Sequence, residues 1–167
     1  FGDSSIARFK MNIPMNGEQP TVASSEKHWL DSEAGITNPN GLRMDDDKLY
    51  VSNNSQIFRF QFDSAGEITV GEELFDSGIA IIDDIMPFCG GVAITDYLGG
   101  RLVYFGQHIE EVAGEEVESF SQDYATLPLA FSFPSSIAVG QAPFFSGDQL
   151  LITEKGILQD PNSSIGN

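Results

Sequence analysis

The sequence predicts an all-β protein made of repeated strand hairpins, and two observations support this fold class. The first is a hairpin signal, in which the strands Gly41–Met44 and Leu49–Ser52 flank the polar turn Asp45–Lys48. Short runs of β-branched and aromatic residues bounded by turn residues are typical of a hairpin. The second observation is recurrence, because similar hairpins follow at residues 84–96 and 136–154. Repetition of one strand unit, more than any single motif, indicates the fold.

The period of the repeat narrows the fold class to a β-propeller. The second strand of each hairpin closes on a small hydroxyl residue, and these residues, Ser52, Thr95 and Thr153, lie 43 and 58 residues apart. A strand-rich period of about 40–50 residues is typical of a propeller blade, which is a four-stranded sheet. The chain is therefore predicted to supply about three blades, half of a six-bladed ring.

A single propeller domain is expected over residues 1–167, with approximate blades at 1–35 (partial), 36–78, 79–130 and 131–167 (partial). A closed ring needs roughly four to eight blades, so the remaining blades are expected from the rest of a longer chain or from a second chain. The run Ser5–Met11 resembles a late strand of a blade, whereas Leu150–Thr153 resembles an early strand. A late-strand pattern near the start and an early-strand pattern near the end favour the interpretation that the sequence is a fragment of a longer chain.

Four other features lead to distinct expectations. Gln56–Phe62 alternates in hydrophobicity, which is typical of a strand with one buried face. The polar segment Ser24–Gly35 is expected to be a loop that crosses between blades. Glu110–Glu118, with five glutamates among nine residues, is expected to be a solvated acidic loop, with a short helix as the alternative. Cys89 is expected to be a buried, inert thiol.

The charge balance excludes two classes of partner. The chain has 25 Asp and Glu against 8 Lys and Arg, a net charge of −17. A field of this sign repels nucleic acid and anionic membrane surfaces, and no apolar run approaches the length of about 18 residues that a membrane span needs.

Asn53 and Asn162 each begin a glycosylation sequon, so both are candidate acceptors if the protein is secreted. A secretory location is favoured over a cytoplasmic one.

The entries to the inner strands are the expected place for chemistry. The innermost strands of a propeller gather round a central channel, so equivalent entry residues converge; these are Asn40, Asp84, and the pair Ser135 and Ser136. Amide and carboxylate oxygens suit Ca²⁺ or Mg²⁺, and a carboxylate beside such an ion can act as general base toward a metal-held water. Asn40 and Asp84 are therefore candidate metal ligands, with turn or capping roles as the alternative.

Three motifs, taken in order, resemble a known superfamily. They are Pro39-Asn-Gly-Leu with Leu49-Tyr-Val, Asp83-Asp-Ile with Asp96-Tyr-Leu-Gly-Gly-Arg-Leu, and Pro134-Ser-Ser-Ile-Ala-Val-Gly with Leu151-Ile-Thr-Glu-Lys-Gly. Over roughly residues 36–156 the chain resembles the C-terminal half of the six-bladed propellers related to gluconolactonase, regucalcin, diisopropylfluorophosphatase-type esterases and strictosidine synthase.

The resemblance implies metal-assisted hydrolysis of a small lactone or ester at the channel mouth. In the lactonase branch, the Asn of the first motif and the Asp of the second bind the catalytic cation, which implies Asn40 and Asp84. The Asp also serves as a base there, and a remaining metal-binding Glu comes from an earlier blade. The second motif has Asp-Asp-Ile where lactonases usually have Pro-Asp-Gly, which leaves Asp83 and Asp84 as alternative site residues.

Two further hypotheses stay open. Fungal relatives in natural-product pathways steer cyclisations such as hetero-Diels–Alder additions without a metal. Such a site needs mainly shape and a few hydrogen bonds, so the candidate substrate-binding residues are Tyr97, Ser135, Ser136 and Asn53. The third hypothesis is a non-catalytic binding propeller whose channel is only packed core. Fold alone does not choose among the three.

Overall fold

The computed structural model describes residues 4–156, and these residues contain twelve β-strands and one short 3-10 turn. The strands form four antiparallel sheets, so the all-β prediction is confirmed. The chain divides into two compact units, Phe1–Pro39 and Asn40–Asn167. None of the described segments is a helix long and apolar enough to cross a membrane.

The first unit is a hairpin of β1 (Ile6–Asn12) and β2 (Thr21–Leu30). The strand β2 replaces the crossing loop that the sequence suggested from Ser24 onward. Most of its side chains are exposed, so it lacks the apolar alternation by which a strand is recognised. The turn η1 (Ser32–Ala34) follows, and the Asp31 side chain caps it by accepting a hydrogen bond from the Glu33 N–H at 2.9 Å.

In the second unit, the first sheet contains β3 (Pro39–Asp45), β4 (Lys48–Asn53), β5 (Gln56–Phe62) and β6 (Ile68–Asp76), in sequence order. The predicted first hairpin corresponds to β3 and β4. The expectation of one buried face for Gln56–Phe62 is wrong. Ile57 and Phe60 are three residues apart and so point to opposite faces, yet they are only 0% and 3% exposed.

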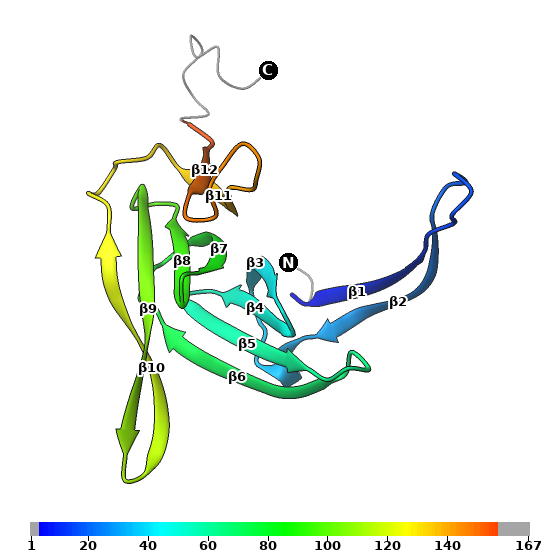
Figure 1. The fold of residues 1–167 in the computed structure, drawn as a ribbon, viewed down its shortest axis with the longest axis horizontal. Coiled ribbons are helices and arrows are strands. Elements are labelled where there is room, and N and C mark those ends of the chain that lie inside the picture. The colour runs from blue at the N-terminus through cyan, green and yellow to red at the C-terminus, as the bar shows by residue number, and fades with distance from the viewer. Residues whose placement is uncertain (1–3, 157–167) are drawn as a thin grey trace. The chain divides into compact units, whose positions relative to one another are not determined.

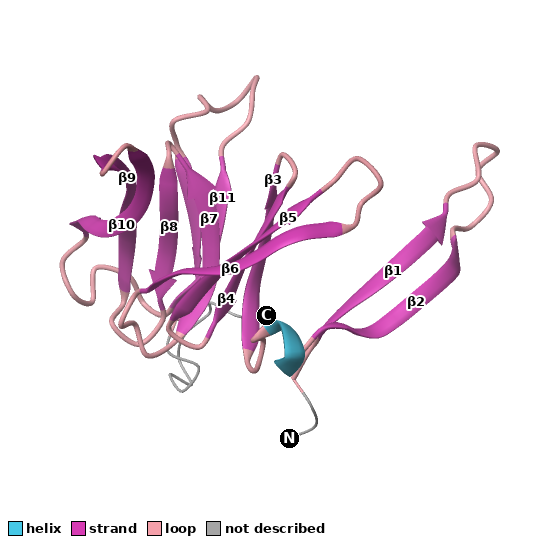
Figure 2. Cartoon of the chain, turned by 90° about the horizontal axis from the view of Figure 1, so that it is seen from below, coloured by secondary structure: helices cyan, strands magenta, loops and turns pink. Residues whose placement is uncertain are grey.

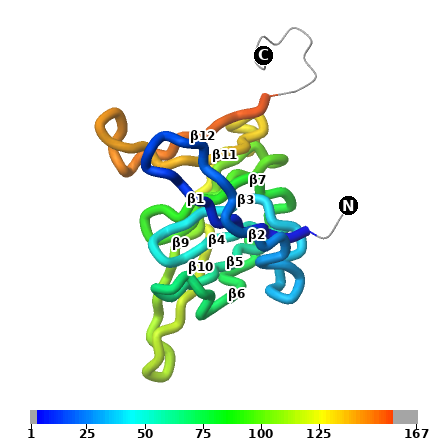
Figure 3. The backbone as a smooth tube through the Cα atoms, turned by 90° about the vertical axis from the view of Figure 1, so that its right-hand side faces the viewer, coloured from blue at the N-terminus to red at the C-terminus, as the bar shows by residue number. Residues whose placement is uncertain are grey.

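The second sheet contains β7 (Ile82–Phe88), β8 (Gly91–Asp96), β9 (Arg101–Val112) and β10 (Glu115–Ala125), also in sequence order. The hairpin of β9 and β10 is long (Figures 1 and 3). Its turn is formed by Ala113 and Gly114, both with positive φ. The acidic segment Glu110–Glu118 is therefore strand and turn and not a loop, because charged side chains remain solvated along an exposed hairpin. Cys89 is exposed in the turn between β7 and β8 and is not a buried thiol.

The third hairpin of the prediction corresponds to β11 (Pro134–Val139) and β12 (Leu150–Glu154), which form a two-stranded sheet. The strand β11 lies beside β7 (Figures 1 and 2). The first strands of two successive repeats are thus neighbours, as the repeat interpretation requires.

The main core lies between the two four-stranded sheets and is built from aliphatic side chains with a few aromatic ones. Its members are Tyr50, Ile57, Ile79, Ile82, Ile85, Val92, Ile94, Val103 and Phe105. At the edge of this core the Arg59 guanidinium of β5 donates to Glu118 of β10 at 2.7 and 2.9 Å and to Glu72 of β6 at 2.6 Å. The hydrogen bonds with Glu118 raise the pKa of Arg59 above its ordinary value. The ion pair of Arg59 and Glu118 connects the two sheets.

Candidate functional site

Small hydroxyl residues fix the entries to the inner strands. The Gly41 N–H donates to Ser52 Oγ at 2.7 Å, and the Asp84 N–H donates to Thr95 Oγ1 at 2.8 Å. Each pair is 11 residues apart, so Gly41 and Asp84 are equivalent positions. In the third hairpin Ser136 faces Thr153 and takes the same place.

Because Gly41 and Asp84 are equivalent, Asn40 does not align with Asp84 as the sequence suggested; the alignment of the entry residues shifts by one position. Asn40 precedes Gly41, so its counterpart in the second hairpin is Asp83 and not Asp84, and its counterpart in the third is Ser135. The prediction that entry residues of successive repeats converge is thus met by Asn40 and Asp83. Asn40 Nδ2 donates to Asp83 Oδ1 at 3.3 Å and to the Ile82 carbonyl at 2.9 Å.

Asp84 lies between the inner strands, and its side chain is only 7% exposed. Oδ1 accepts the Ile85 N–H at 2.9 Å. Oδ2 accepts the Ile137 N–H at 2.9 Å and the Ser136 hydroxyl at 3.1 Å, and it forms an ion pair with Arg43. Four donors from β3, β7 and β11 thus converge on one carboxylate. Buried charges persist in proteins when they are paired and hydrogen-bonded in this way.

The predicted metal ligands Asn40 and Asp84 do not fit a shared divalent cation. Both Asp84 oxygens already accept hydrogen bonds, and the positive charge beside them is Arg43. A cation at Oδ2 would have to displace Arg43 and leave the donors Ile137 N–H and Ser136 Oγ without an acceptor. Within residues 4–156, no three His, Cys, Asp or Glu side chains are grouped so as to hold a metal ion.

Asp83 has a different environment at the strand entry. Its Oδ2 accepts a hydrogen bond from Lys155 Nζ at 2.8 Å, and this ammonium lies 5.1 Å from the centre of the Tyr97 ring. The hydrogen bond with Asp83 raises the pKa of Lys155, so the side chain remains a cation. Tyr97 in turn packs on Phe133, with ring centres 5.1 Å apart. We call Asn40, Asp83, Tyr97, Phe133 and Lys155 the entry cluster.

A pocket of about 440 Å³ adjoins the entry cluster. Tyr97 and Phe133 line it together with Leu98, Gly100, Glu154 and the segment 129–132. The segment is held in an unusual backbone conformation, because Leu129 and Phe133 have φ of 58° and 54°. Gly100 is required beside it, since a Cβ there would lie 2.5 Å from the Phe131 carbonyl oxygen. The result is a mainly apolar hollow in which Glu154 is the one charged lining residue among those described.

The other predicted binding residues are occupied by structural contacts. Ser135 Oγ lies 3.1 Å from Thr153 Oγ1, and Ser136 Oγ bonds Asp84. Asn53 is 2% exposed at the end of β4, and a side chain this buried has no room for a glycan. The glycosylation prediction for Asn53 is therefore wrong for this fold. The second sequon, at Asn162, lies outside the described residues.

Lys155 and Arg43 were missed at the level of sequence. Lys155 follows the hydroxyl residue Thr153 by two positions, and Tyr97 follows Thr95 by two, so the repeat alignment already made them equivalent. Arg43 carried no comparable signal. Its partners Asp84 and the Ile137 carbonyl lie 41 and 94 residues away in the chain.

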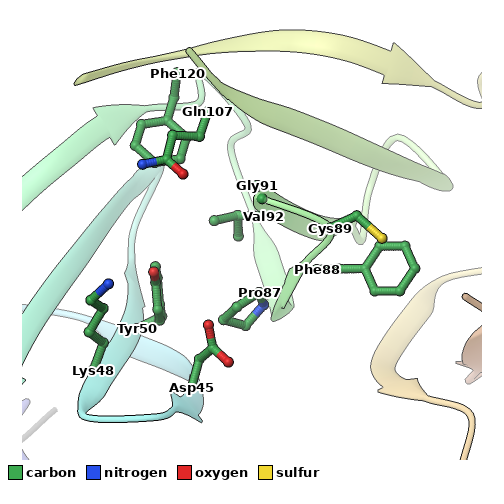
Figure 4. A pocket seen from close by; sticks show the side chains of 11 residues that line it. Asp45, Lys48, Tyr50, Pro87, Phe88, Cys89, Gly91, Val92, Gln107 and Phe120 are labelled. Atoms are coloured by element: carbon green, nitrogen blue, oxygen red, sulfur yellow. The ribbon is translucent and has the colours of Figure 1, made fainter. Parts of the chain in front are cut away.

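A second pocket, of about 210 Å³, lies at the opposite end of β7, between the two four-stranded sheets. Figure 4 shows Lys48, Tyr50 and Asp45 from the first sheet and Gln107 from the second around this space. Sites for organic ligands usually have volumes of about 300–1,000 Å³. The pocket beside the entry cluster falls in this range and this one does not.

A serine, a histidine and an aspartate also meet on the exposed face of β9 and β10. Ser121 Oγ and Asp123 Oδ1 lie 2.8 and 3.1 Å from the same nitrogen, Nε2 of His108. In a catalytic triad the two partners of the histidine bind different ring nitrogens, so that one nitrogen can accept the serine proton. This cluster lacks that arrangement, and we assign it no catalytic role.

Comparison of the chain with protein-family models, with curated proteins and with solved structures found no match.

Proposed function

We propose that the chain supplies blades of a β-propeller of the gluconolactonase-like superfamily, and that its strand-entry face is a metal-independent site for a small organic molecule. The two consecutive four-stranded antiparallel sheets support the propeller. One observation carries the site: Asp83 holds Lys155 over the ring of Tyr97, beside an apolar pocket.

The expected ligand has an apolar or aromatic body and one carboxylate or carbonyl oxygen. Tyr97 and Phe133 offer ring surfaces for the body, since aromatic rings prefer offset or tilted packing at such distances. The Lys155 ammonium, which lies 5.1 Å from the ring centre of the lining residue Tyr97, offers a charge-assisted hydrogen bond to the oxygen. Because the pKa of Lys155 is raised, this residue acts as a cationic donor and not as a base.

The reaction class that suits this arrangement is a cyclisation or condensation of an unsaturated carbonyl compound. An ammonium directed at the carbonyl oxygen stabilises negative charge that develops there in the transition state. An apolar pocket that holds a flexible substrate in a folded form removes part of the entropic barrier. Metal-assisted hydrolysis through Asn40 and Asp84 is not proposed, because both carboxylate oxygens of Asp84 are occupied.

The test compares two probes that share a phenylpropanoyl body and differ in charge at its polar end, 3-phenylpropanoate and the neutral 3-phenylpropanamide, by titration calorimetry. We expect the carboxylate to bind about tenfold more tightly, the effect of one charge-assisted hydrogen bond. The variant Lys155→Met should remove this preference. Lys27→Met, a change of an exposed lysine in the first unit, should leave it intact.

Two outcomes would contradict the proposal. One is equal binding of both probes, or a preference that survives Lys155→Met. The other is a rise in melting temperature with millimolar Ca²⁺ that is lost in Asp84→Asn, since a ligand that binds the folded state stabilises it. The second outcome would restore the metal-dependent hypothesis.

A further inference from the structure

The pocket of about 210 Å³ between the two four-stranded sheets contains polar groups that the fold does not use. Its lining comes from β3 and β4 of the first sheet and from β7–β10 of the second, all within the second unit. Because a water molecule takes about 30 Å³ in the liquid, the pocket has room for about seven water-sized groups. It is too small for a large organic ligand but large enough for a molecule of about six to eight non-hydrogen atoms.

Tyr50 of β4 gives the strongest indication of a ligand. The residue is 8% exposed, and its ring belongs to the main core. Figure 4 shows its hydroxyl pointing out of the core into the pocket. No group within residues 4–156 forms a hydrogen bond with this hydroxyl. Since buried hydroxyls are as a rule hydrogen-bonded, this one indicates a bound molecule that supplies the missing partner.

Two opposite charges beside Tyr50 are also unpaired. The two-residue turn between β3 and β4 places Asp45 and Lys48 opposite each other, with their side chains on one face of the sheet. Lys48 and Tyr50 are two positions apart on β4, so they share this face. In the part of the chain that the structure describes, neither charged side chain forms an ion pair or a hydrogen bond. The pocket thus presents one cation and one anion that the fold does not neutralise.

The second sheet closes the pocket with an amide and an aromatic ring. Gln107 and Phe120 face each other across β9 and β10. Gln107 Nε2 donates to Glu118 Oε1 at 2.7 Å, which leaves the amide oxygen of Gln107 as an acceptor. Pro87 and Val92 add apolar surface to the lining. This side of the pocket therefore suits an apolar group.

We infer that the pocket binds a small zwitterion, an α-amino acid with a short apolar side chain. The Lys48 ammonium and the Tyr50 hydroxyl donate to its carboxylate, and the Asp45 carboxylate accepts from its ammonium group. The apolar side chain of the ligand lies against Phe120 and Val92. A ligand with a single charge would leave either Asp45 or Lys48 unpaired, which favours the zwitterion.

The inference does not depend on the ligand proposed for the entry cluster, because that cluster lies at the opposite end of β7 and shares no residue with this pocket.

The first test compares L-valine with two analogues that each lack one charged group, by titration calorimetry on the full chain. 3-Methylbutanoate lacks the ammonium group, and 2-methylpropan-1-amine lacks the carboxylate. We expect L-valine to bind at least about tenfold more tightly than either analogue, because each analogue loses a charge-assisted hydrogen bond. L-Tryptophan, which exceeds the volume of the pocket, should bind much more weakly than L-valine.

Two results would overturn the inference. One is the lack of measurable L-valine binding up to about 10 mM. The other is an analogue, or L-tryptophan, that binds as tightly as L-valine.

The second test identifies the Tyr50 hydroxyl as a ligand-binding group. Tyr50→Phe keeps the ring in the core and removes only the hydroxyl. We expect L-valine binding to weaken about fivefold, the effect of one neutral hydrogen bond, while the melting temperature of the free protein does not fall. Tyr124→Phe, at a tyrosine that is 58% exposed, is the matched control and should change neither quantity. Unchanged L-valine binding in Tyr50→Phe would refute the assignment.

The third test assigns the two charges. Asp45→Asn should remove the preference for L-valine over 3-methylbutanoate, because it removes the partner of the ammonium group. Lys48→Met should remove the preference for L-valine over 2-methylpropan-1-amine, because it removes the partner of the carboxylate. If both preferences survive in these variants, L-valine binds elsewhere and the inference is wrong.

Discussion

Asp83 and Asp84 are consecutive carboxylates with opposite environments. The Asp84 side chain is 7% exposed and accepts hydrogen bonds from three strands, with Arg43 as its counter-ion. The Asp83 side chain is 17% exposed and faces Lys155 and Asn40 at the strand entry. The first carboxylate connects strands, and the second positions a cation beside a pocket. A conspicuous carboxylate at a strand entry can thus be fully used by the fold, while its neighbour holds a cation beside a pocket.

The difference has a physical cause. A buried carboxylate is tolerated only when each oxygen has partners, because unpaired charge in the interior costs several kcal/mol. The partners that make Asp84 stable leave it little capacity to bind anything else. Asp83 keeps part of its surface in water and exchanges partners at low cost.

The largest expected effect on the free energy of unfolding comes from removing the buried carboxylate of Asp84. Asp84→Ala removes the acceptor of four donors and leaves the guanidinium of Arg43 without its counter-ion. We expect a loss of about 3–5 kcal/mol in the free energy of unfolding, measured by urea denaturation. Asp83→Ala, one position away, should cost less than about 1 kcal/mol.

Should Asp84→Ala fail to fold, Asp84→Asn provides the same comparison with the side-chain shape retained. Losses of similar size for the two positions would show that the buried and exposed environments differ less than the structure indicates.

An intermediate loss of unfolding free energy is expected when the Thr95 hydroxyl, which accepts the Asp84 N–H, is removed. Thr95→Val keeps the shape of a fully buried side chain but leaves the Asp84 N–H without its acceptor at 2.8 Å. This should cost about 1–3 kcal/mol in urea denaturation. Thr69→Val, at an exposed threonine, is the matched control and should change stability by less than about 0.5 kcal/mol. No difference between the two variants would contradict the assigned role of Thr95.

The smallest effect concerns the pH dependence of the Asp83 pair. The hydrogen bond with Asp83 raises the folded-state pKa of Lys155 above its unfolded value. The contribution of this pair is therefore fully present below the unfolded pKa and is lost as the pH rises through the folded pKa. Because the Lys155 side chain is 47% exposed, we expect a contribution of less than about 1 kcal/mol, which decreases further with added salt.

The measurement is the difference in unfolding free energy between wild type and Asp83→Asn, followed from neutral pH to above the ordinary lysine range. The difference should be constant at first and should vanish at the alkaline end. Two results would contradict the assignment of Lys155 as the stabilising partner of Asp83. One is a difference that disappears only on acidification, and the other is a difference that does not change with salt.

Much of the fold could be predicted from the repeat. The hairpins at β3–β4, β7–β8 and β11–β12 follow from short apolar runs between turn residues, and the small hydroxyl residues marked their equivalence. The part of β2 from Ser24 onward and the end of β9 could not be recognised. Their side chains are exposed on both faces, so backbone pairing holds them and leaves no apolar pattern.

The sequence by itself determined the all-β class, the hairpin repeat and the acidic surface, because these depend on local propensity and composition. Only the tertiary structure decided which aspartate is buried. Asp83 and Asp84 together face the single residue Thr95, so a bulge interrupts the regular alternation of the strand. The bulge and the donors around Asp84 come from partner strands far away in the chain, and local periodicity carries no information about them.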